Sequence, residues 1–181
     1  MAVQIFNGTH KVSSGGLFII TSLMNAVETR MSPLVSRFAQ YLILAFDMEQ
    51  SDSQTLNLTC GAISDLSTYM PEAAIEYCPQ FIEKLQKVLN DDGFETETKL
   101  RAITATGDLC LATGDKFFPY LDTTFSSLGK ASQASLNKGE DPEEVQIYEQ
   151  LRYALIDSYL TLYHGMVDEE NLTKARNNGQ M

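Results

Sequence analysis

Apolar residues recur at helical spacing behind three prolines of this chain, Pro33, Pro79 and Pro119. The positions two, six and nine residues after each proline are all apolar: Val35, Ala39 and Leu42, then Phe81, Leu85 and Val88, then Leu121, Phe125 and Leu128. Offsets of this kind lie on one face of an α-helix. Because proline suits the first helical position, the pattern predicts three helices that begin at these prolines.

A second set of apolar positions precedes each proline. When Asn25, Asp65 and Asp108 are aligned, the residues five before and one after are apolar in all three: Ile20 and Ala26, Cys60 and Leu66, Ile103 and Leu109. The prolines are 46 and 40 residues apart, and two helices in a unit of about that length are typical of HEAT and armadillo repeats. No segment alternates with the period of a strand. The sequence therefore predicts an all-α fold, an α-α superhelix of about three and a half helix-hairpin repeats.

Polar and glycine-containing stretches between these patterns predict the boundaries of the repeats. They give an irregular start or partial repeat at 1–12, HEAT repeats at 13–50, 51–93 and 94–138, the first helix of a further repeat at 139–167, and a polar tail at 168–181. The clearest helix start combines an N-cap Asp141, a first-position Pro142 and Glu144 three residues after the cap. Asp52 or Ser51 is expected to cap an earlier helix.

The charge of the chain favours basic partners. The formal net charge is −11, which repels phosphates and makes nucleic acid a poor partner. Three cysteines, Cys60, Cys78 and Cys110, have no metal-type spacing, and two of them fall on apolar helix faces. This usage favours a reducing compartment. With no hydrophobic run of about 18 residues, the chain is expected to be intracellular and to have no membrane partner.

The sequence offers little for catalysis. Its two histidines, His10 and His164, have no Cys, Asp or Glu at zinc-ligand spacing. No phosphate-binding glycine loop or nucleophile elbow occurs. We therefore expect no catalytic, cofactor-binding or metal-binding residue and no enzymatic activity. An enzyme built on a helical bundle is the remaining alternative of that class, and turnover that needs His164 would support it.

Several stretches resemble the importin-β family of nuclear import receptors. The similar segments are TGDLCLATG at 106–114, YLD at 120–122, LGKASQAS at 128–135, GAISDL at 61–66, and Leu151, Arg152 and Tyr159. Together they cover roughly residues 13–167. The resemblance implies a segment from the second half of the HEAT-repeat superhelix, located in cytoplasm and nucleus and at nuclear pores, with the Ran GTPase as a partner of the full-length receptor.

The resemblance also implies two binding faces. In this family the second helices of the pairs line the concave face, where acidic side chains receive the basic segment of importin-α or a basic cargo. Glu83 and Asp122, expected near the starts of second helices, are the candidates, with Asp91 and Asp92 at the end of a second helix as weaker ones. The alternative for each residue is a solvated charged face.

On the convex face, shallow apolar slots between neighbouring first helices accept Phe side chains of FG-repeat nucleoporins. Leu58 and Leu111 are the candidates, since both point away from the expected core; the alternative is that they pack between repeats. Uncapped repeat ends also predict self-association of the chain. The competing interpretation of the whole is a HEAT scaffold of another kind, such as another karyopherin or a phosphatase regulatory subunit.

Overall fold

The computed structural model describes residues 14–27, 33–47, 52–136 and 141–166, and within them every regular element is a helix. The elements are α2 (Ser14–Val27), α3 (Val35–Asp47), α4 (Ser53–Tyr69), α5 (Pro71–Asn90), α6 (Thr96–Thr113), the 3₁₀ helix η2 (Gly114–Tyr120), α7 (Leu121–Ala134) and α8 (Pro142–Met166). The predicted segments 1–12 and 168–181 lie outside the described residues. The all-α prediction is confirmed for the part described.

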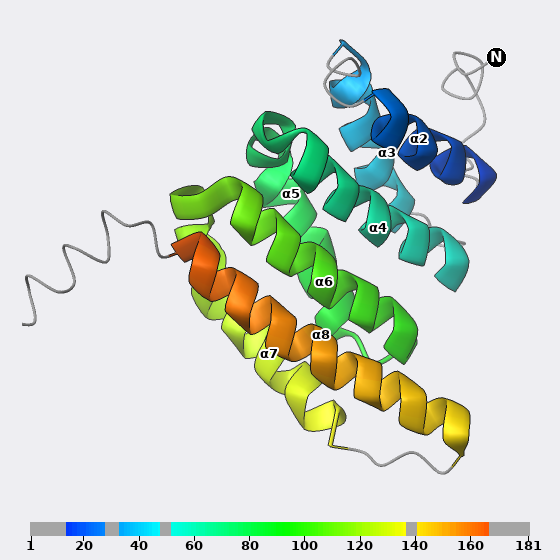
Figure 1. The fold of residues 1–181 in the computed structure, drawn as a ribbon, viewed down its shortest axis with the longest axis vertical. Coiled ribbons are helices and arrows are strands. Elements are labelled where there is room, and N and C mark those ends of the chain that lie inside the picture. The colour runs from blue at the N-terminus through cyan, green and yellow to red at the C-terminus, as the bar shows by residue number, and fades with distance from the viewer. Residues whose placement is uncertain (1–13, 28–32, 48–51, 137–140, 167–181) are drawn as a thin grey trace, which may run out of the picture.

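The helices stand in two rows (Figure 1). The first helices of the pairs form one row, in which α2 packs on α4, α4 on α6, and α6 on α8. The second helices form the other row, in which α3 packs on α5 and α5 on α7. Each hairpin thus covers the apolar side of the next, which is the architecture of a repeat solenoid. The predicted superhelix of stacked hairpins is confirmed.

Two helix starts are capped as the sequence predicts. The Asp52 carboxylate accepts a hydrogen bond from the Thr55 N–H at 2.7 Å and begins α4. The Asp141 carboxylate accepts from the N–H groups of Glu143 and Glu144, both at 2.9 Å, and begins α8. These bonds satisfy N–H groups that have no partner inside the helix.

The prediction that helices begin at the three prolines is wrong in detail. Pro79 lies inside α5, whose first residue is instead Pro71. Pro33 and Pro119 lie in short 3₁₀ segments that lead into α3 and α7. Proline inside a helix removes one backbone hydrogen bond, but Pro79 is on the exposed face of α5, where water can bind the freed carbonyl.

Ala26 lies outside the residues whose side chains are described; the other predicted apolar positions form one continuous core with one exception. On α3 and α5, the residues Ala39, Leu42, Phe81, Leu85 and Val88 are buried, as are Cys60, Leu66, Ile103 and Leu109 of the first helices. Phe125 on α7 is partly exposed, and its ring stacks on that of Tyr159 of α8 at 6.0 Å between centroids. It closes the edge of the last hairpin instead of filling the core.

Polar bonds between successive second helices fix the register of their row. Lys84 on α5 forms an ion pair with Asp47 at the end of α3, at 2.5 Å. On the other side of α5, the Asn90 amide donates to the Ser127 hydroxyl of α7 at 2.9 Å, and the Lys130 ammonium donates to the Asn90 carbonyl at 3.1 Å. These contacts join residues about one repeat apart, so they tie each hairpin to its neighbour.

Candidate partner-binding surfaces

The four acidic candidates all lie exposed on or next to second helices. Asp122 is in the first turn of α7, as predicted. Asp91 and Asp92 follow the end of α5, where Asp91 accepts a bond from the Gly93 N–H at 2.8 Å and Asp92 lies 3.5 Å from the Lys99 ammonium. Glu83 is far from the start of its helix, because α5 begins at Pro71. That part of the prediction is wrong.

Two further glutamates share the face of Glu83. Glu72 and Glu76 are exposed on α5. Glu76 lies four residues after Glu72, and Glu83 lies eleven residues after it; both spacings return to the same side of a helix. We call Glu72, Glu76 and Glu83 the acidic stripe. The apolar pattern behind Pro79 does not indicate Glu72 and Glu76, because it predicts a helix that begins at Pro79; the signal for them is Pro71 followed directly by Glu72.

Basic residues also lie on the second helices, next to or beyond the acidic stripe. Lys84 is held by Asp47, and its side chain is mostly buried. Lys87 on α5 and Lys130 on α7 are exposed. The second helices therefore present a mixed surface on which the acidic stripe is the strongest concentration of like charge along a single described helix face in this row.

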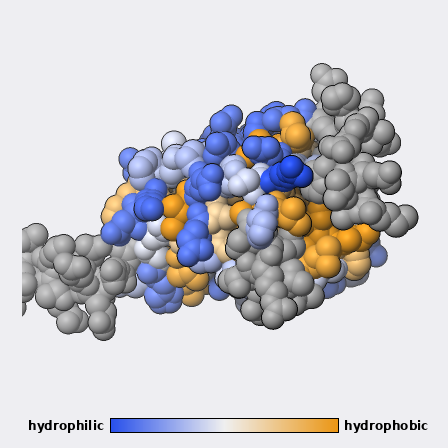
Figure 2. Space-filling model, turned by 90° about the horizontal axis from the view of Figure 1, so that it is seen from above, coloured by the Kyte–Doolittle hydropathy of each residue, from blue (hydrophilic) through white to orange (hydrophobic). Residues whose placement is uncertain are grey.

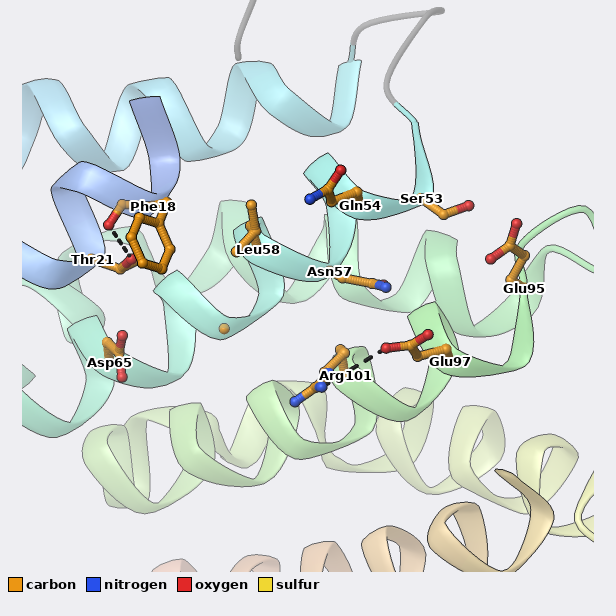
Figure 3. Close-up of a pocket in the computed structure, with 11 residues that line it drawn as sticks. Phe18, Thr21, Ser53, Gln54, Asn57, Leu58, Asp65, Glu95, Glu97 and Arg101 are labelled. Atoms are coloured by element: carbon orange, nitrogen blue, oxygen red, sulfur yellow. Dashed lines mark hydrogen bonds and ion pairs between the residues drawn. The ribbon is translucent and has the colours of Figure 1, made fainter. Parts of the chain in front are cut away.

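An open groove of about 620 Å³ lies among the first helices α2, α4 and α6 (Figure 3). Its apolar end contains Phe18 of α2 and Leu58 of α4, and Gly61 lines the space between them. A Cβ atom built on Gly61 meets no other atom within 4 Å. The absent side chain at this position therefore leaves open space that a partner's side chain can enter.

The other end of the groove is polar. Arg101 and Glu97 of α6 face each other there, with 3.8 Å between guanidinium and carboxylate (Figure 3). Between the two ends lies Asn57, whose buried side-chain oxygen has no hydrogen-bond partner. A buried acceptor without a donor costs free energy.

The two apolar candidates have different surroundings. Leu58 is half-buried and lines the groove. Leu111 on α6 is 55% exposed, which agrees with its predicted outward direction, but it is not part of the groove lining. The structure therefore does not bring the two candidates into one site. Phe18 and Gly61 complete the groove and were missed, because nothing in the local sequence relates α2 to α4.

A row of carboxylates crosses the first helices at Asp65 of α4, Asp108 of α6 and Asp157 of α8. Burial raises the pKa of Asp65, and the charge of Asp108 raises it further. Burial also raises the pKa of Asp108; a hydrogen bond from Ser64 offsets part of this effect, and Asp157 adds to it. The ionised carboxylates of Asp65 and Asp108 therefore destabilise the folded chain.

We expect Asp108→Asn to raise the melting temperature at pH 7 by roughly 1–3 °C, because the amide keeps a partner for Ser64 without the charge. The folded-state pKa lies above the unfolded value of about 3.9, so stability falls as pH rises from about 4 through the folded-state pKa. The gain should vanish below about pH 4. Thermal denaturation from pH 3 to 8 measures it, with exposed Glu149→Gln as the control; a gain that persists at pH 3 would contradict the assignment.

The cysteines act as core residues. All three are free and buried, and burial raises the pKa of Cys60 and Cys110 to about 12 and that of Cys78 to about 11. Thiols of this kind are not nucleophiles at neutral pH. Among the described residues, no group of three or more His, Cys, Asp or Glu side chains is placed to hold a metal ion. No described helix has the length and hydropathy of a membrane span.

Comparison with known proteins identifies the family. Residues 2–176 match the family model described as "Importin subunit beta-1-like, TPR repeats". The chain belongs to this family. Importin subunit beta-1 of Arabidopsis thaliana is 22% identical over 150 residues, which are 82% of this chain and 17% of the relative. Importin subunit beta-1 of Saccharomyces cerevisiae is 22% identical over 152 residues, 84% of this chain and 17% of the relative.

Solved structures of importin-β share the fold. Yeast importin-β (Kap95p) superposes with a TM-score of 0.71 at 20% identity over 84% of this chain and 17% of that one. A second Kap95p structure, which reports that Kap95p binding induces the switch loops of RanGDP to adopt the GTP-bound conformation, gives a TM-score of 0.69 at 20% identity, over 84% of this chain and 18% of that one. This importin-β family chain thus spans about a sixth of the length of those relatives.

Proposed function

We propose that this chain acts in nuclear import as a binding module with two faces and performs no chemistry. The observation that carries the proposal is the match to the importin subunit beta-1-like family along residues 2–176. The structure supports it by presenting an acidic stripe on the second helices and an open groove on the first helices. We place the protein in the cytoplasm and the nucleus and at nuclear pores.

The acidic stripe is the proposed site for importin-α or a basic cargo. Glu72, Glu76 and Glu83 follow one exposed side of α5, so a basic helix lying along α5 can contact them in succession. Asp122 on the neighbouring α7 extends the same charge, with Asp91 and Asp92 at the far end of α5. Charges of one sign on such a surface speed the encounter with an oppositely charged partner and select it.

The groove is the proposed site for a Phe side chain of an FG nucleoporin. Phe18 and Leu58 supply apolar contact, and Gly61 leaves room for an inserted ring. Leu111 is kept as a second, separate candidate because it is exposed on α6.

We expect Gly61→Leu to weaken FG-peptide binding at least tenfold, because a Cβ atom at this position meets no other atom within 4 Å and the leucine side chain would extend into the open groove. A tenfold change in affinity corresponds to the loss of about 1.4 kcal/mol of binding free energy, which is what one blocked apolar subsite would account for. Fluorescence anisotropy with a labelled FG peptide measures it, and circular dichroism checks the fold. The paired variant Leu111→Arg tests the second candidate; if only this variant loses binding, the groove is not the site.

Ran is proposed as a partner of the longer receptor, not of these helices alone. Kap95p, the relative of similar fold, is reported to act on RanGDP, and this chain matches only 18% of that structure. We therefore expect no Ran binding by the chain itself in the same anisotropy assay.

A parallel pull-down with a basic adaptor helix and with an FG peptide tests the proposed function. Binding of both is expected. If a folded chain binds neither, the import proposal fails, and a HEAT scaffold of another class, such as another karyopherin or a phosphatase regulatory subunit, becomes the better account.

A further inference from the structure

Two lysines interrupt the negative charge along the row of second helices. Lys87 lies four residues after Glu83 and eleven after Glu76, and both spacings return to the side of α5 that carries the acidic stripe. Lys130 is exposed on the neighbouring α7, and its ammonium donates to the side-chain carbonyl of Asn90, the last residue of α5, at 3.1 Å. Because Asn90 is three residues from Lys87 and so its neighbour on the helix, both ammonium groups lie around this end of α5.

The charge of the two lysines is not neutralised within the described part of the chain. Lys84, the other lysine of α5, forms an ion pair with α3, whereas Lys87 and Lys130 form no ion pair with a described residue. The carboxylates that follow α5 have other partners, since Asp91 accepts a backbone N–H and Asp92 lies beside a lysine of α6. Two positive charges therefore remain exposed directly beyond the acidic stripe.

Hydrogen bonds hold the Lys130 ammonium in position. The Asn90 amide nitrogen donates to the Gln86 carbonyl at 2.8 Å and to the Ser127 hydroxyl of α7 at 2.9 Å. These two bonds fix the amide group, and its oxygen then accepts from Lys130. The amide is neutral, so it positions the ammonium group without cancelling its charge. A cation that is already positioned loses less conformational entropy when it binds an anion.

The exposed face of α5 offers a partner charge instead of apolar contact. Apart from Pro71 and Pro79, every exposed residue of α5 is polar. Seen from above, hydrophilic side chains cover much of the described surface, and apolar ones gather on a smaller part of it (Figure 2). A basic residue placed beyond Glu83 would meet the charges of Lys87 and Lys130, and like charges brought together weaken binding. A uniformly basic segment therefore does not match this face.

We propose that the segment bound at the acidic stripe carries an acidic residue as well as basic ones, and that Lys87 and Lys130 bind its carboxylate. The inference rests on the proposed function, because it concerns the same partner and the same row of helices. At a rise of about 1.5 Å per residue, Lys87 lies about 6 Å along α5 beyond Glu83. A helical partner lying along α5 carries its acidic residue about one turn beyond its last basic contact.

The helix dipole sets the direction of this partner. The N-terminus of a helix carries about half a positive charge and its C-terminus about half a negative one. The partner therefore lies with its N-terminal end over Glu72 and Glu76 and with its C-terminal end at the two lysines. The dipole of α5 has the same direction, but its partial charges are smaller than the full charges of these side chains. The acidic residue of the partner thus follows its basic residues in sequence.

Fluorescence anisotropy with two labelled helical peptides tests the inference on the full chain at about 0.15 M salt. Both peptides carry three arginines at the spacing of the acidic stripe; four residues after the last arginine, one has glutamate and the other glutamine. We expect the glutamate peptide to bind about three- to tenfold more tightly. Attraction by the net charge of −11 alone predicts the opposite order, because the glutamine peptide is the more positive of the two.

Single variants assign this preference to the two lysines. Lys87→Gln and Lys130→Gln should each lower the ratio of the two affinities at least twofold, as a double-mutant cycle measures it. Lys116→Gln removes the same charge from an exposed position on η2 and should leave the ratio unchanged. Circular dichroism checks that every variant is folded.

The outcomes separate this inference from the proposed function. If both peptides bind and the glutamine peptide binds at least as tightly, the inference is overturned and the acidic stripe remains a site. The inference is also overturned if Lys116→Gln lowers the ratio as much as Lys87→Gln does. If a folded chain binds neither peptide, the acidic stripe itself is not a site, and the inference fails with it.

Discussion

Replacement of Phe81 by alanine is expected to lower the free energy of unfolding by about 3–5 kcal/mol, because it empties a fully enclosed site. Phe81 is completely buried on α5, and its ring centroid lies 6.1 Å from that of Tyr77. It sits in the middle hairpin, which packs on both neighbours. Chemical denaturation followed by circular dichroism measures the change.

The matched control is Phe118→Ala. Phe118 is a phenylalanine on η2 that is substantially exposed, and its replacement should change stability by less than about 1 kcal/mol. If both variants lost similar stability, the core that joins the hairpins would not be where the structure places it.

Reversal of the acidic stripe has the largest expected effect on binding. With Glu72, Glu76 and Glu83 all replaced by Lys, we expect affinity for a basic adaptor helix to fall about 10- to 100-fold at 0.15 M salt. Exposed ion pairs contribute about 0.5–1 kcal/mol each, so three lost pairs give about 1.5–3 kcal/mol. Anisotropy titrations with a labelled basic helix measure the change, and the difference should shrink as salt is added.

A triple variant of equal charge change separates a local effect from a global one. Glu143, Glu149 and Asp157 are exposed on α8, in the row of first helices, and their replacement by Lys should change affinity for the basic helix less than threefold. Equal losses in both triple variants would mean that only net charge matters and that the acidic stripe is not a site.

The fold could be predicted from the sequence where local signals agreed with packing. Asp141 and Pro142 combine a cap and a first-position proline, and α8 begins there. The start of α5 was missed for a physical reason: Met70, which precedes Pro71, makes no side-chain cap bond, and a single residue separates α4 from α5. A connection that short leaves no polar loop to read.

The binding surfaces were harder to predict because they depend on contacts between repeats. Leu58 could be chosen from its direction on one helix, but the groove around it needs Phe18 and Arg101 from the helices on both sides. Glu83 could be chosen by resemblance, whereas its partners in the acidic stripe depended on where α5 begins. The pattern within a helix gives a residue's direction, and only the stacking of helices gives its neighbours.

The central claim is that the two rows of helices carry separate binding faces. The most direct test is to titrate a labelled basic adaptor helix into the chain with and without a saturating unlabelled FG peptide. We expect binding in both cases, with dissociation constants that agree within about twofold. Displacement of the basic helix by the FG peptide, or absence of binding to a chain shown to be folded, would contradict the account.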